Sequence, residues 1–369
     1  MFIWEAVRAV ARHGHQVRVV AMHHPDALNH EIIDGIEIRR PTYWWPVSKE
    51  MLRKDVGGLP INWRRYPLAR LQMVPFILVH WLAALRCAWG CDVVHAHWTL
   101  SAAAAYMGKG IHRRPIVATL QGSDIFQAVK LPLVTPIVRY ILRRCDQVTV
   151  LSQALKRATA EIGISSDDIC IVPNGVDIKN FVPLNQNCRE NIILYVGSLI
   201  DRKGVNYLID AFCNVRTQLP DYRLMIIGDG PAAKALKDQS TRLGIADLVD
   251  FYGFMPQDDI KFWMQRARLF VLPSVEEGLG VVLLEALACG TPIVASSVGG
   301  IVDVVTEDVG CLVPPADVQA FSEAIVQVLR ADHWKMMSMR ARERAVAYYD
   351  WDVIAGKYIA IYSRVVNRC

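Results

Sequence analysis

Two glutamates, Glu277 and Glu285, stand eight residues apart around a glycine-rich turn that contains Gly278 and Gly280. The segment after the turn is apolar and predicts a helix. In a helix, the two carboxylates would be separated by up to about 12 Å along the axis. This separation suits hydroxyl groups at the two ends of an extended ligand, because carboxylates accept hydrogen bonds well and the N–H groups at a helix start suit phosphates. A surface acid followed by an ordinary helical glutamate is the alternative that the spacing leaves open.

Short apolar segments rich in β-branched residues alternate with helical patterns along most of the chain. Strands are predicted at 15–22, 92–98, 115–120, 147–151 and 168–173 in the first half, and at 191–197, 223–228, 248–253, 268–273 and 292–296 in the second. Helices are predicted at 71–88, 133–144, 152–163, 316–330, 333–348 and 352–366. This alternation predicts an α/β protein whose sheets are parallel and covered on both faces.

The alternation restarts after the polar residues 184–188, which predicts a domain boundary there. We therefore expect two facing Rossmann-like domains, residues 1–183 and 184–350. The last helix, 351–369, would return to the N-terminal domain. A ligand is expected in the crevice between the domains, where the carboxyl ends of the strands meet.

The composition excludes disordered, collagenous and disulfide-stapled proteins, since 53% of the residues are hydrophobic and 21% are charged. The nine cysteines are scattered and form no Cys-x-x-Cys pair, which indicates reduced thiols of a cytoplasmic protein and no zinc site. Residues 1–190 contain 23 Lys and Arg against 15 Asp and Glu, an excess of +8, whereas the remainder carries −3. The basic half is expected to meet an anionic partner.

The segment SVEEGLGVVLLEALACGTPIVASSVGG resembles the C-terminal signature of glycosyltransferase family 4, which comprises retaining nucleotide-sugar transferases of the GT-B fold. The resemblance continues in VGSLIDRKGVNYLIDAF, IIGDGP, YGFMP, VPNGVD and DVVHAHWTLSAAAA. The segments GSLI, RKG and GSDI are most similar to the polysaccharide-assembly branch of that family. The resemblance implies an N-terminal acceptor-binding domain and a C-terminal domain that binds the nucleotide sugar.

The resemblance also implies roles for single residues in binding the donor. Glu285 would accept hydrogen bonds from the ribose, and Glu277 from hydroxyls of the donor sugar. Lys203 would bind the diphosphate, and Arg202 would add charge, because Ser198 stands where the family usually has a basic residue. Further donor-binding residues are expected at the acidic segment and at three strand ends: Gly278, Leu279, Gly280, Gly197, Gly228 and Gly253.

The N-terminal side of the crevice is expected to contain Gln121, Gly122, Asp124 and His97. The family commonly has a histidine at the position of Gln121, and glutamine can donate a hydrogen bond but cannot become cationic. Asp124 would contact a ligand or cap a helix, and His97 would line the crevice or the core. We expect His95 in the core. No third ligand accompanies the two histidines, so no metal site is expected. No cofactor is expected either.

Residues 41–70 interleave tryptophans with lysines and arginines, a composition that suits an anionic membrane surface or an acceptor lipid. Nucleic acid is not expected as a partner, because no nucleic-acid-binding motif accompanies this stretch. The apolar run 71–89 is interpreted as too short and too interrupted to span a membrane. We expect it to form a core helix, with a membrane-contacting helix face as the alternative.

The resemblance implies transfer of a sugar from a nucleoside diphosphate sugar to a glycan or lipid-linked acceptor, with retention of configuration. A nucleotide-sugar epimerase of the same architecture and a non-catalytic sugar-nucleotide-binding subunit are the alternatives. The protein is expected in the cytoplasm, at the inner face of the plasma membrane. Residues 2–21 resemble the family's first helix and second strand. We therefore expect the family's first strand and glycine-rich loop to be missing from this chain.

Overall fold

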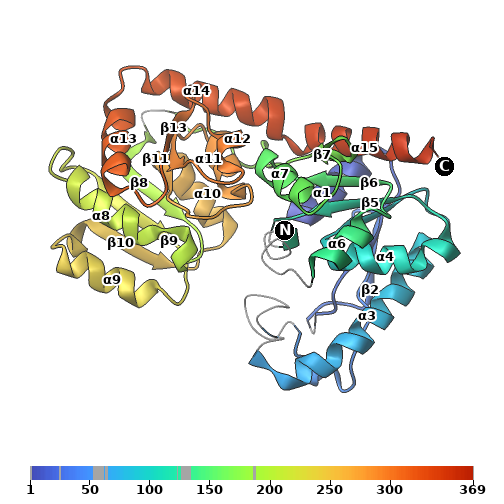
Figure 1. Ribbon diagram of the computed structural model, residues 1–369. Helices are drawn as coiled ribbons and strands as arrows, with labels where there is room; N and C mark the ends of the chain where they lie inside the picture. The colour runs from blue at the N-terminus through green and yellow to red at the C-terminus, as the bar shows by residue number, and fades with distance from the viewer. Residues whose placement is uncertain are drawn as a thin grey trace. The chain divides into compact units, whose positions relative to one another are not determined.

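The computed structural model describes residues 2–24, 26–52, 62, 65–122, 124–125, 134–185 and 188–368. The chain forms two compact units (Figure 1). Unit 1 comprises Met1–Val150, Arg157–Cys170 and Ala355–Cys369, and unit 2 comprises Leu151–Lys156 and Ile171–Ile354. The domain limits given above, at 183/184 and 350/351, stay predictions.

Unit 1 contains two sheets. The larger sheet has the order β4 (Val94–His97), β5 (Ile116–Leu120), β6 (Gln147–Val150), β7 (Ile169–Ile171), and β4, β5 and β6 run parallel. The smaller sheet has the order β1 (Arg18–Val20), β3 (Ile36–Arg39), β2 (His30–Ile33). In the smaller sheet β1 is parallel to β3, but β2 is antiparallel to it, so the expectation of purely parallel sheets is wrong for this strand. The prediction of a missing first strand is not tested by this arrangement.

The β2–β3 hairpin was not expected from the apolar patterns, although its turn has a recognisable sequence. Asp34 and Gly35 both have positive φ angles, 51° and 76°. An Asp-Gly pair with both φ angles positive is the preferred two-residue turn between antiparallel strands, because its twist matches that of the strands. The short strands on either side of the turn are too exposed to give a strong apolar signal.

Helices of unit 1 cover its sheets, and the C-terminal helix is fixed to them by polar contacts. The helices lying within this unit are α1 (Phe2–Arg12), α3 (Pro67–Ala88), α4 (Thr99–His112) and α6 (Thr135–Leu142). Two further helices, α7 (Gln153–Glu161) and α15 (Trp351–Val366), run from one unit into the other. His95 is in hydrogen-bond contact with the Tyr362 hydroxyl of α15 at 2.7 Å and with Thr119 at 2.6 Å. His95 is half-buried, and these two contacts anchor α15 to β4 and β5.

Unit 2 is built on a six-stranded parallel sheet with the order β10 (Val249–Gly253), β9 (Arg223–Ile227), β8 (Glu190–Val196), β11 (Ala267–Leu272), β12 (Ile293–Ser296), β13 (Gly310–Val313). Its helices are α8 (Val205–Val215), α9 (Ala233–Arg242), α10 (Gln257–Arg266), α11 (Val281–Ala288), α12 (Ile301–Val304), α13 (Val318–Arg330) and α14 (Trp334–Arg344). Every strand predicted from the sequence is present, whereas β13 was not predicted. The strand order reverses between β8 and β11, and parallel sheets bind ligands at such a switch point, outside the carboxyl ends of the strands.

Candidate functional site

The loop after β8 carries the basic residues of the site. This basic loop, residues 197–204, contains the short helix η4 (Asp201–Lys203). The Lys203 side chain is only 15% exposed, whereas Arg202 is open to solvent. The backbone N–H of Val275 donates to the carbonyl oxygen of Arg202 at 2.8 Å. Because β8 and β11 are neighbours, this hydrogen bond joins the basic loop to the loop after β11.

The loop after β11, residues 273–280, is here called the acidic loop. The Glu277 carboxylate contacts the Lys203 ammonium as an ion pair and accepts a hydrogen bond from the Gly278 N–H at 3.1 Å. Leu279 is buried, so only its backbone can face a ligand, and Gly280 precedes the first residue of α11. The predicted Lys203, Arg202, Glu277 and the residues after it are thus brought together at the switch point.

The backbone of the acidic loop is held by two contacts that were not identified from the sequence. A Cβ atom at Gly299 would lie 1.8 Å from the carbonyl oxygen of Glu277, and the φ angle of Gly299 is +52°. Glycine is therefore required at this position. The Ser152 hydroxyl donates to the carbonyl oxygen of Gly278 at 3.1 Å. The Gly-Gly pair at 299–300 was a visible signal for the first contact, whereas nothing near Ser152 indicates the second.

Glu285 lies in the second turn of α11. Burial raises the pKa of Glu285 to about 7, and a hydrogen bond from the Gln257 amide partly offsets this increase. Gln257 is the first residue of α10, and its Nε2 donates to Glu285 Oε1 with 3.1 Å between the two atoms. A carboxylate can accept about four hydrogen bonds, so a desolvated carboxyl with one donor can accept further hydrogen bonds, for example from the hydroxyls of a ribose. Gln257 is 28 residues away in sequence, so no local pattern indicates this contact.

Three predicted glycines lie at the carboxyl ends of strands: Gly197 follows β8, Gly228 follows β9, and Gly253 is the last residue of β10. The Gly228 N–H donates to the carbonyl oxygen of Gly253 at 2.8 Å, and the Gly197 N–H donates to that of Ile227 at 3.0 Å. A Cβ at Gly228 would lie 1.9 Å from the carbonyl oxygen of Gly197. The glycines therefore allow the three loops to pack backbone against backbone. The Phe254 side chain, which follows Gly253, is 84% exposed beside this packed edge.

The predicted residues of the N-terminal side lie in unit 1, at the ends of β4 and β5. The Gln121 Nε2 is 3.2 Å from His97 Nδ1. Burial lowers the pKa of His97 to about 4, so the ring is neutral at physiological pH. Gln121 and His97 therefore form a neutral hydrogen-bonding pair, and neither supplies a positive charge.

Asp124 is held by backbone groups of its surroundings. One carboxylate oxygen accepts from the N–H groups of Gly122 and Ile125 at 3.0 and 3.1 Å. The other oxygen accepts from the N–H of Thr99, the first residue of α4, at 3.3 Å. Burial raises the pKa of Asp124, although these hydrogen bonds oppose the change. The contacts correspond to the helix-capping alternative for Asp124.

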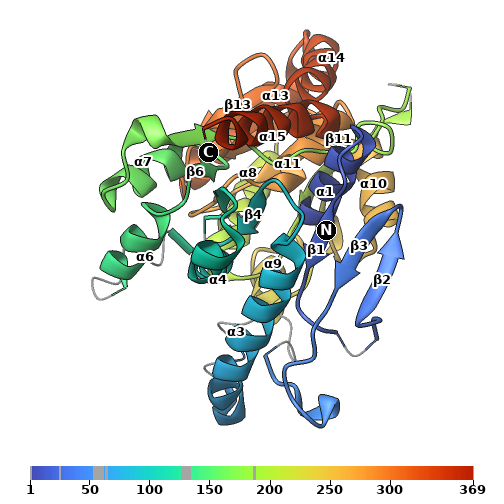
Figure 2. The same ribbon diagram turned by 90° about the vertical axis from the view of Figure 1, so that its right-hand side faces the viewer.

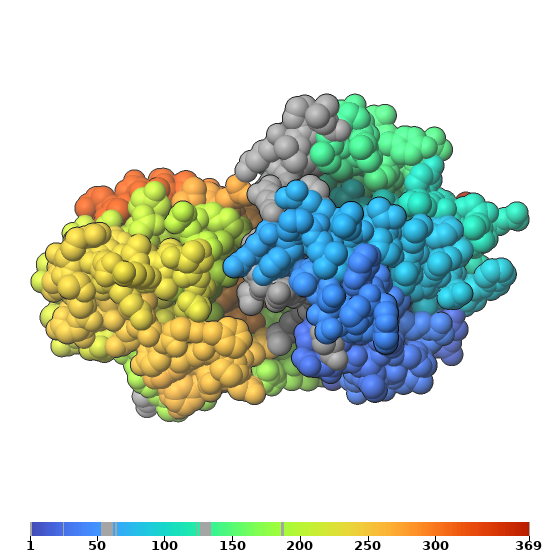
Figure 3. Space-filling view, turned by 90° about the horizontal axis from the view of Figure 1, so that it is seen from below, coloured from blue at the N-terminus to red at the C-terminus, as the bar shows by residue number. Residues whose placement is uncertain are grey.

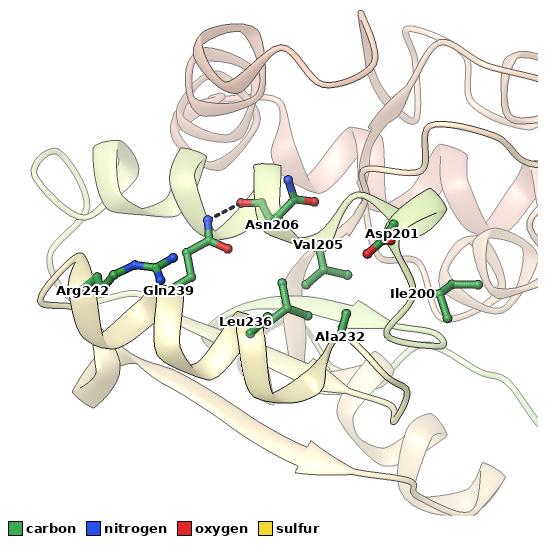
Figure 4. Close-up of a pocket in the computed structure, with 9 residues that line it drawn as sticks. Ile200, Asp201, Val205, Asn206, Ala232, Leu236, Gln239 and Arg242 are labelled. Carbon is green, nitrogen blue, oxygen red and sulfur yellow. Dashed lines mark hydrogen bonds between the residues drawn. The ribbon is translucent and has the colours of Figure 1, made fainter.

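A separate pocket of about 170 Å³ lies between α8 and α9 (Figure 4). Ile200 and Asp201 of the basic loop line one end of it. At the other end, the Gln239 amide donates to the carbonyl oxygen of Asn206 at 2.9 Å. The pocket is lined neither by Lys203 nor by the two glutamates, so it is distinct from the candidate site.

The described residues contain no group of three or more His, Cys, Asp or Glu side chains that could hold a metal ion. At the switch point of unit 2, Lys203 and Arg202 carry positive charge and Glu277 and Glu285 are carboxyl groups. Lysine, arginine and the N–H groups at a helix start can bind a diphosphate, and two carboxylates can bind sugar hydroxyls. The individual roles assigned to these residues stay predictions.

The parallel sheet with a basic and an acidic loop at its switch point, in a chain with a second α/β unit, defines a nucleotide-sugar glycosyltransferase of the GT-B fold. Residues 1–180 match the family described as Glycosyltransferase Family 4, and residues 177–346 match Glycosyl transferases group 1. The chain belongs to glycosyltransferase family 4. It is an enzyme that transfers a sugar from a nucleotide sugar.

Characterised relatives agree with this assignment. The chain is 30% identical over 292 residues to the N-acetyl-alpha-D-glucosaminyl L-malate synthase of Bacillus anthracis, with 75% of each chain covered. It is 28% identical over 356 residues to the 2-deoxystreptamine glucosyltransferase of Streptomyces kanamyceticus, covering 86% of this chain and 92% of that one. The fold is similar to that of sucrose-phosphate synthase from Thermosynechococcus elongatus, with a TM-score of 0.81, 23% identity and coverage of 100% and 93%.

Proposed function

We propose that this enzyme transfers a hexose-type sugar from a nucleoside diphosphate sugar to a glycan or lipid-linked acceptor, with retention of configuration. The observation that carries the proposal is the contact between the Lys203 ammonium and the Glu277 carboxylate at the switch point of unit 2. A cation for the diphosphate and an acceptor for sugar hydroxyls are thus adjacent. Glu285, in the helix that follows, would bind the ribose.

In the proposed reaction, the main difficulty is the negative charge that develops on the leaving diphosphate. Lys203 would bind the diphosphate directly, and Arg202 would contribute from the solvent side. The N–H groups of Leu279 and Gly280, directly before α11, would add further donors. Donors fixed in advance where charge develops are the largest contribution to many enzymatic rate enhancements.

Retention of configuration follows if the acceptor attacks from the face that the diphosphate leaves. The bond between the anomeric carbon and the diphosphate oxygen breaks, and a bond from that carbon to the acceptor oxygen forms. The acceptor hydroxyl proton passes to the departing diphosphate oxygen. Glu277 would hold hydroxyls of the sugar during this step, with its carboxylate released from Lys203 by the diphosphate.

A uridine diphosphate sugar is the donor that we propose to test first. Its support is a solved structure of similar fold, Anabaena HepE in complex with UDP and glucose, which has a TM-score of 0.69 and 23% identity over 81% of this chain and 83% of that one. The acceptor is proposed to bind unit 1, whose part of the chain carries most of the excess positive charge. An anionic, lipid-linked glycan fits that charge.

We place the reaction in the cytoplasm. The support is the state of the cysteines, which are all free thiols in the part of the chain that the structure describes. Reduced thiols are the rule in the cytoplasm and are uncommon in oxidising compartments.

The proposal is tested in two stages. A thermal-shift screen against uridine, guanosine and adenosine diphosphate sugars identifies the donor, because ligand at 100 times its Kd stabilises by about 2.7 kcal/mol. Release of the nucleoside diphosphate is then measured with and without lipid-linked glycan acceptors, and the product anomer is assigned by NMR. Acceptor-dependent release with retention supports the proposal. Conversion of the donor sugar without an acceptor would identify an epimerase, and donor binding without turnover on any acceptor would indicate a binding subunit.

A further inference from the structure

Helix α3 presents an apolar stripe to the surface of unit 1. Leu71, Val74, Leu78 and Leu82 are 69%, 64%, 48% and 41% exposed, respectively. Their spacing of three or four residues places them on one side of the helix. Figure 3 shows the segment, in light blue, at the surface of the molecule. The stripe extends over three turns, which is more than the single exposed apolar residues normal for a protein surface.

The expectations for this segment from its sequence were wrong in two respects. The helix has 22 residues, and among the described residues it is the one that is long and apolar enough to cross a bilayer, by length and composition only. It is not a core helix either, because only 22% of its most apolar window is buried. The alternative interpretation, a helix with a membrane-contacting face, is the one that the exposure pattern favours.

The inner side of α3 is fixed to unit 1 by specific contacts. The buried Gln72 amide donates to the carbonyl oxygen of Lys49 at 2.7 Å and accepts from the Met51 N–H at 2.8 Å. The Phe76 ring packs edge-on against Tyr43, with 5.3 Å between ring centroids. Crossing a bilayer would break these contacts and place the Gln72 amide in hydrocarbon without partners. The helix therefore suits a position parallel to a membrane rather than across it.

The helices around the stripe contain basic side chains and no acidic ones. Helix α3 packs beside α4, which in turn contacts α6 (Figure 2). None of these three helices contains Asp or Glu. The exposed Arg70 and Arg86 lie at the two ends of the stripe, and Trp89, 73% exposed, follows the helix. Further basic residues lie within or directly after α4 and α6: Arg113, Arg114, Arg139, Arg143 and Arg144. Lys109 of α4 is neutralised by an ion pair with Asp146, which follows α6.

We propose that the α3 stripe docks unit 1 onto an anionic lipid bilayer, with the leucines in the acyl boundary and the arginines at the lipid phosphates. Exposed apolar side chains flanked by basic residues bind anionic interfaces in this way, through buried apolar area and attraction to lipid phosphates. A second copy of the chain fits less well, because two stripes with an arginine at each end would repel each other. The physiological meaning rests on the proposed function, since docking would bring the enzyme to a lipid-linked acceptor.

Vesicle co-sedimentation of the full chain, without donor or acceptor, tests the proposal. Vesicles of phosphatidylcholine with phosphatidylglycerol should bind the chain, and vesicles of phosphatidylcholine alone should not. The double variant Leu71→Gln/Val74→Gln should weaken binding at least about tenfold, since the affinity of such helices scales with buried apolar area. Arg86→Gln should weaken it about fivefold, and added salt should weaken the wild-type chain further.

Matched controls come from α14 of unit 2, where Met336 and Met339 are exposed to a similar extent, 52% and 53%, and Lys335 is exposed. Met336→Gln/Met339→Gln and Lys335→Gln should bind vesicles as the wild type does. An unchanged far-UV circular-dichroism spectrum and thermal unfolding of the full chain confirm that each variant is folded. Unchanged vesicle binding by the Leu71→Gln/Val74→Gln variant would overturn the proposal.

Two other results would also overturn it. One is equal binding to neutral vesicles at high salt. The other is self-association in sedimentation equilibrium that the Leu71→Gln/Val74→Gln variant abolishes, without vesicle binding by either protein. If the chain does not bind vesicles, its turnover of a soluble acceptor is still expected. Failure of the proposed function leaves vesicle binding intact, so the two outcomes are distinguishable.

Discussion

The carboxyl group of Glu285 should destabilise the free protein and, at the same time, bind the donor. Its pKa is raised from an ordinary value of 4.5 to about 7 by burial. A carboxyl whose pKa is higher in the folded state favours folding when it is protonated. The free energy of unfolding should therefore fall as the pH rises from about 4.5 to above 7, by roughly 3 kcal/mol at pH 8.

Glu285→Gln tests this assignment because glutamine keeps an acceptor for Gln257 and has no charge to desolvate. The variant should be about 2–3 kcal/mol more stable than the wild type at pH 8, and less than about 1 kcal/mol more stable at pH 5. Thermal or urea unfolding at both pH values measures the difference. Glu307→Gln is the matched control, since this exposed glutamate of unit 2 should change stability by less than about 0.5 kcal/mol at either pH.

The same variant should lose donor affinity. Replacing a carboxylate that accepts two ribose hydroxyls removes a charge-assisted hydrogen bond, at a cost of roughly 1.5–3 kcal/mol. In the wild type, affinity for the nucleoside diphosphate should fall as the pH drops below 7, because binding requires the ionised carboxyl. Calorimetric titration at pH 6 and 8 measures both effects. A variant that is more stable at pH 8 but binds the nucleotide normally would show that Glu285 is buried for structural reasons alone.

Three further substitutions examine the loops. Lys203→Ala should lower kcat/KM by about 10²–10³, and Arg202→Ala by less than about tenfold, because only Lys203 is enclosed beside Glu277; equal large losses would show that Arg202 has an equivalent role. Glu277→Gln should lower kcat at least about tenfold while the nucleoside diphosphate binds equally well or more tightly, since Lys203 loses its partner; unchanged turnover would remove Glu277 from the site. Gly299→Ala should destabilise unit 2 by about 2–4 kcal/mol. Gly244→Ala is the control and should cost about 1 kcal/mol, because Gly244 also has a positive φ angle but no atom lies within 4 Å of an added Cβ. Equal melting temperatures of the two variants would refute the close contact.

The sheet of unit 2 could be predicted because its strands are continuous apolar runs that recur at regular intervals. β8, for example, contains five consecutive buried residues. The β2–β3 hairpin could not be found in this way, since β2 has no buried residue. Helix α3 was placed correctly but its burial was not, because its apolar residues are distributed on both sides and no charged side marks the surface. Composition alone does not distinguish such a helix from one in the core.

The candidate site could be predicted only as far as it is local in sequence. Glu277, Glu285 and the glycines between them belong to one segment, and Arg202 and Lys203 to another. The hydrogen bonds that hold these groups come from residues distant in sequence. Gln257 donates to Glu285 across 28 residues, and Ser152 donates to the Gly278 carbonyl across 126. A hydrogen bond between separate loops depends on the register of the whole sheet. No spacing within either segment indicates it.

The ion pair in the free site has a consequence for the order of binding events. Lys203 neutralises Glu277 while both are largely withdrawn from water, with side chains 15% and 12% exposed. In the proposed function, a diphosphate that takes Lys203 leaves the Glu277 carboxylate without its cation. Removing one partner of a buried pair is costly unless another group satisfies the charge that remains. The hydroxyls of an attached sugar would satisfy it, whereas a nucleoside diphosphate without sugar would not. The intact donor should therefore bind more tightly than the product nucleotide, and transfer of the sugar should itself favour release of that product.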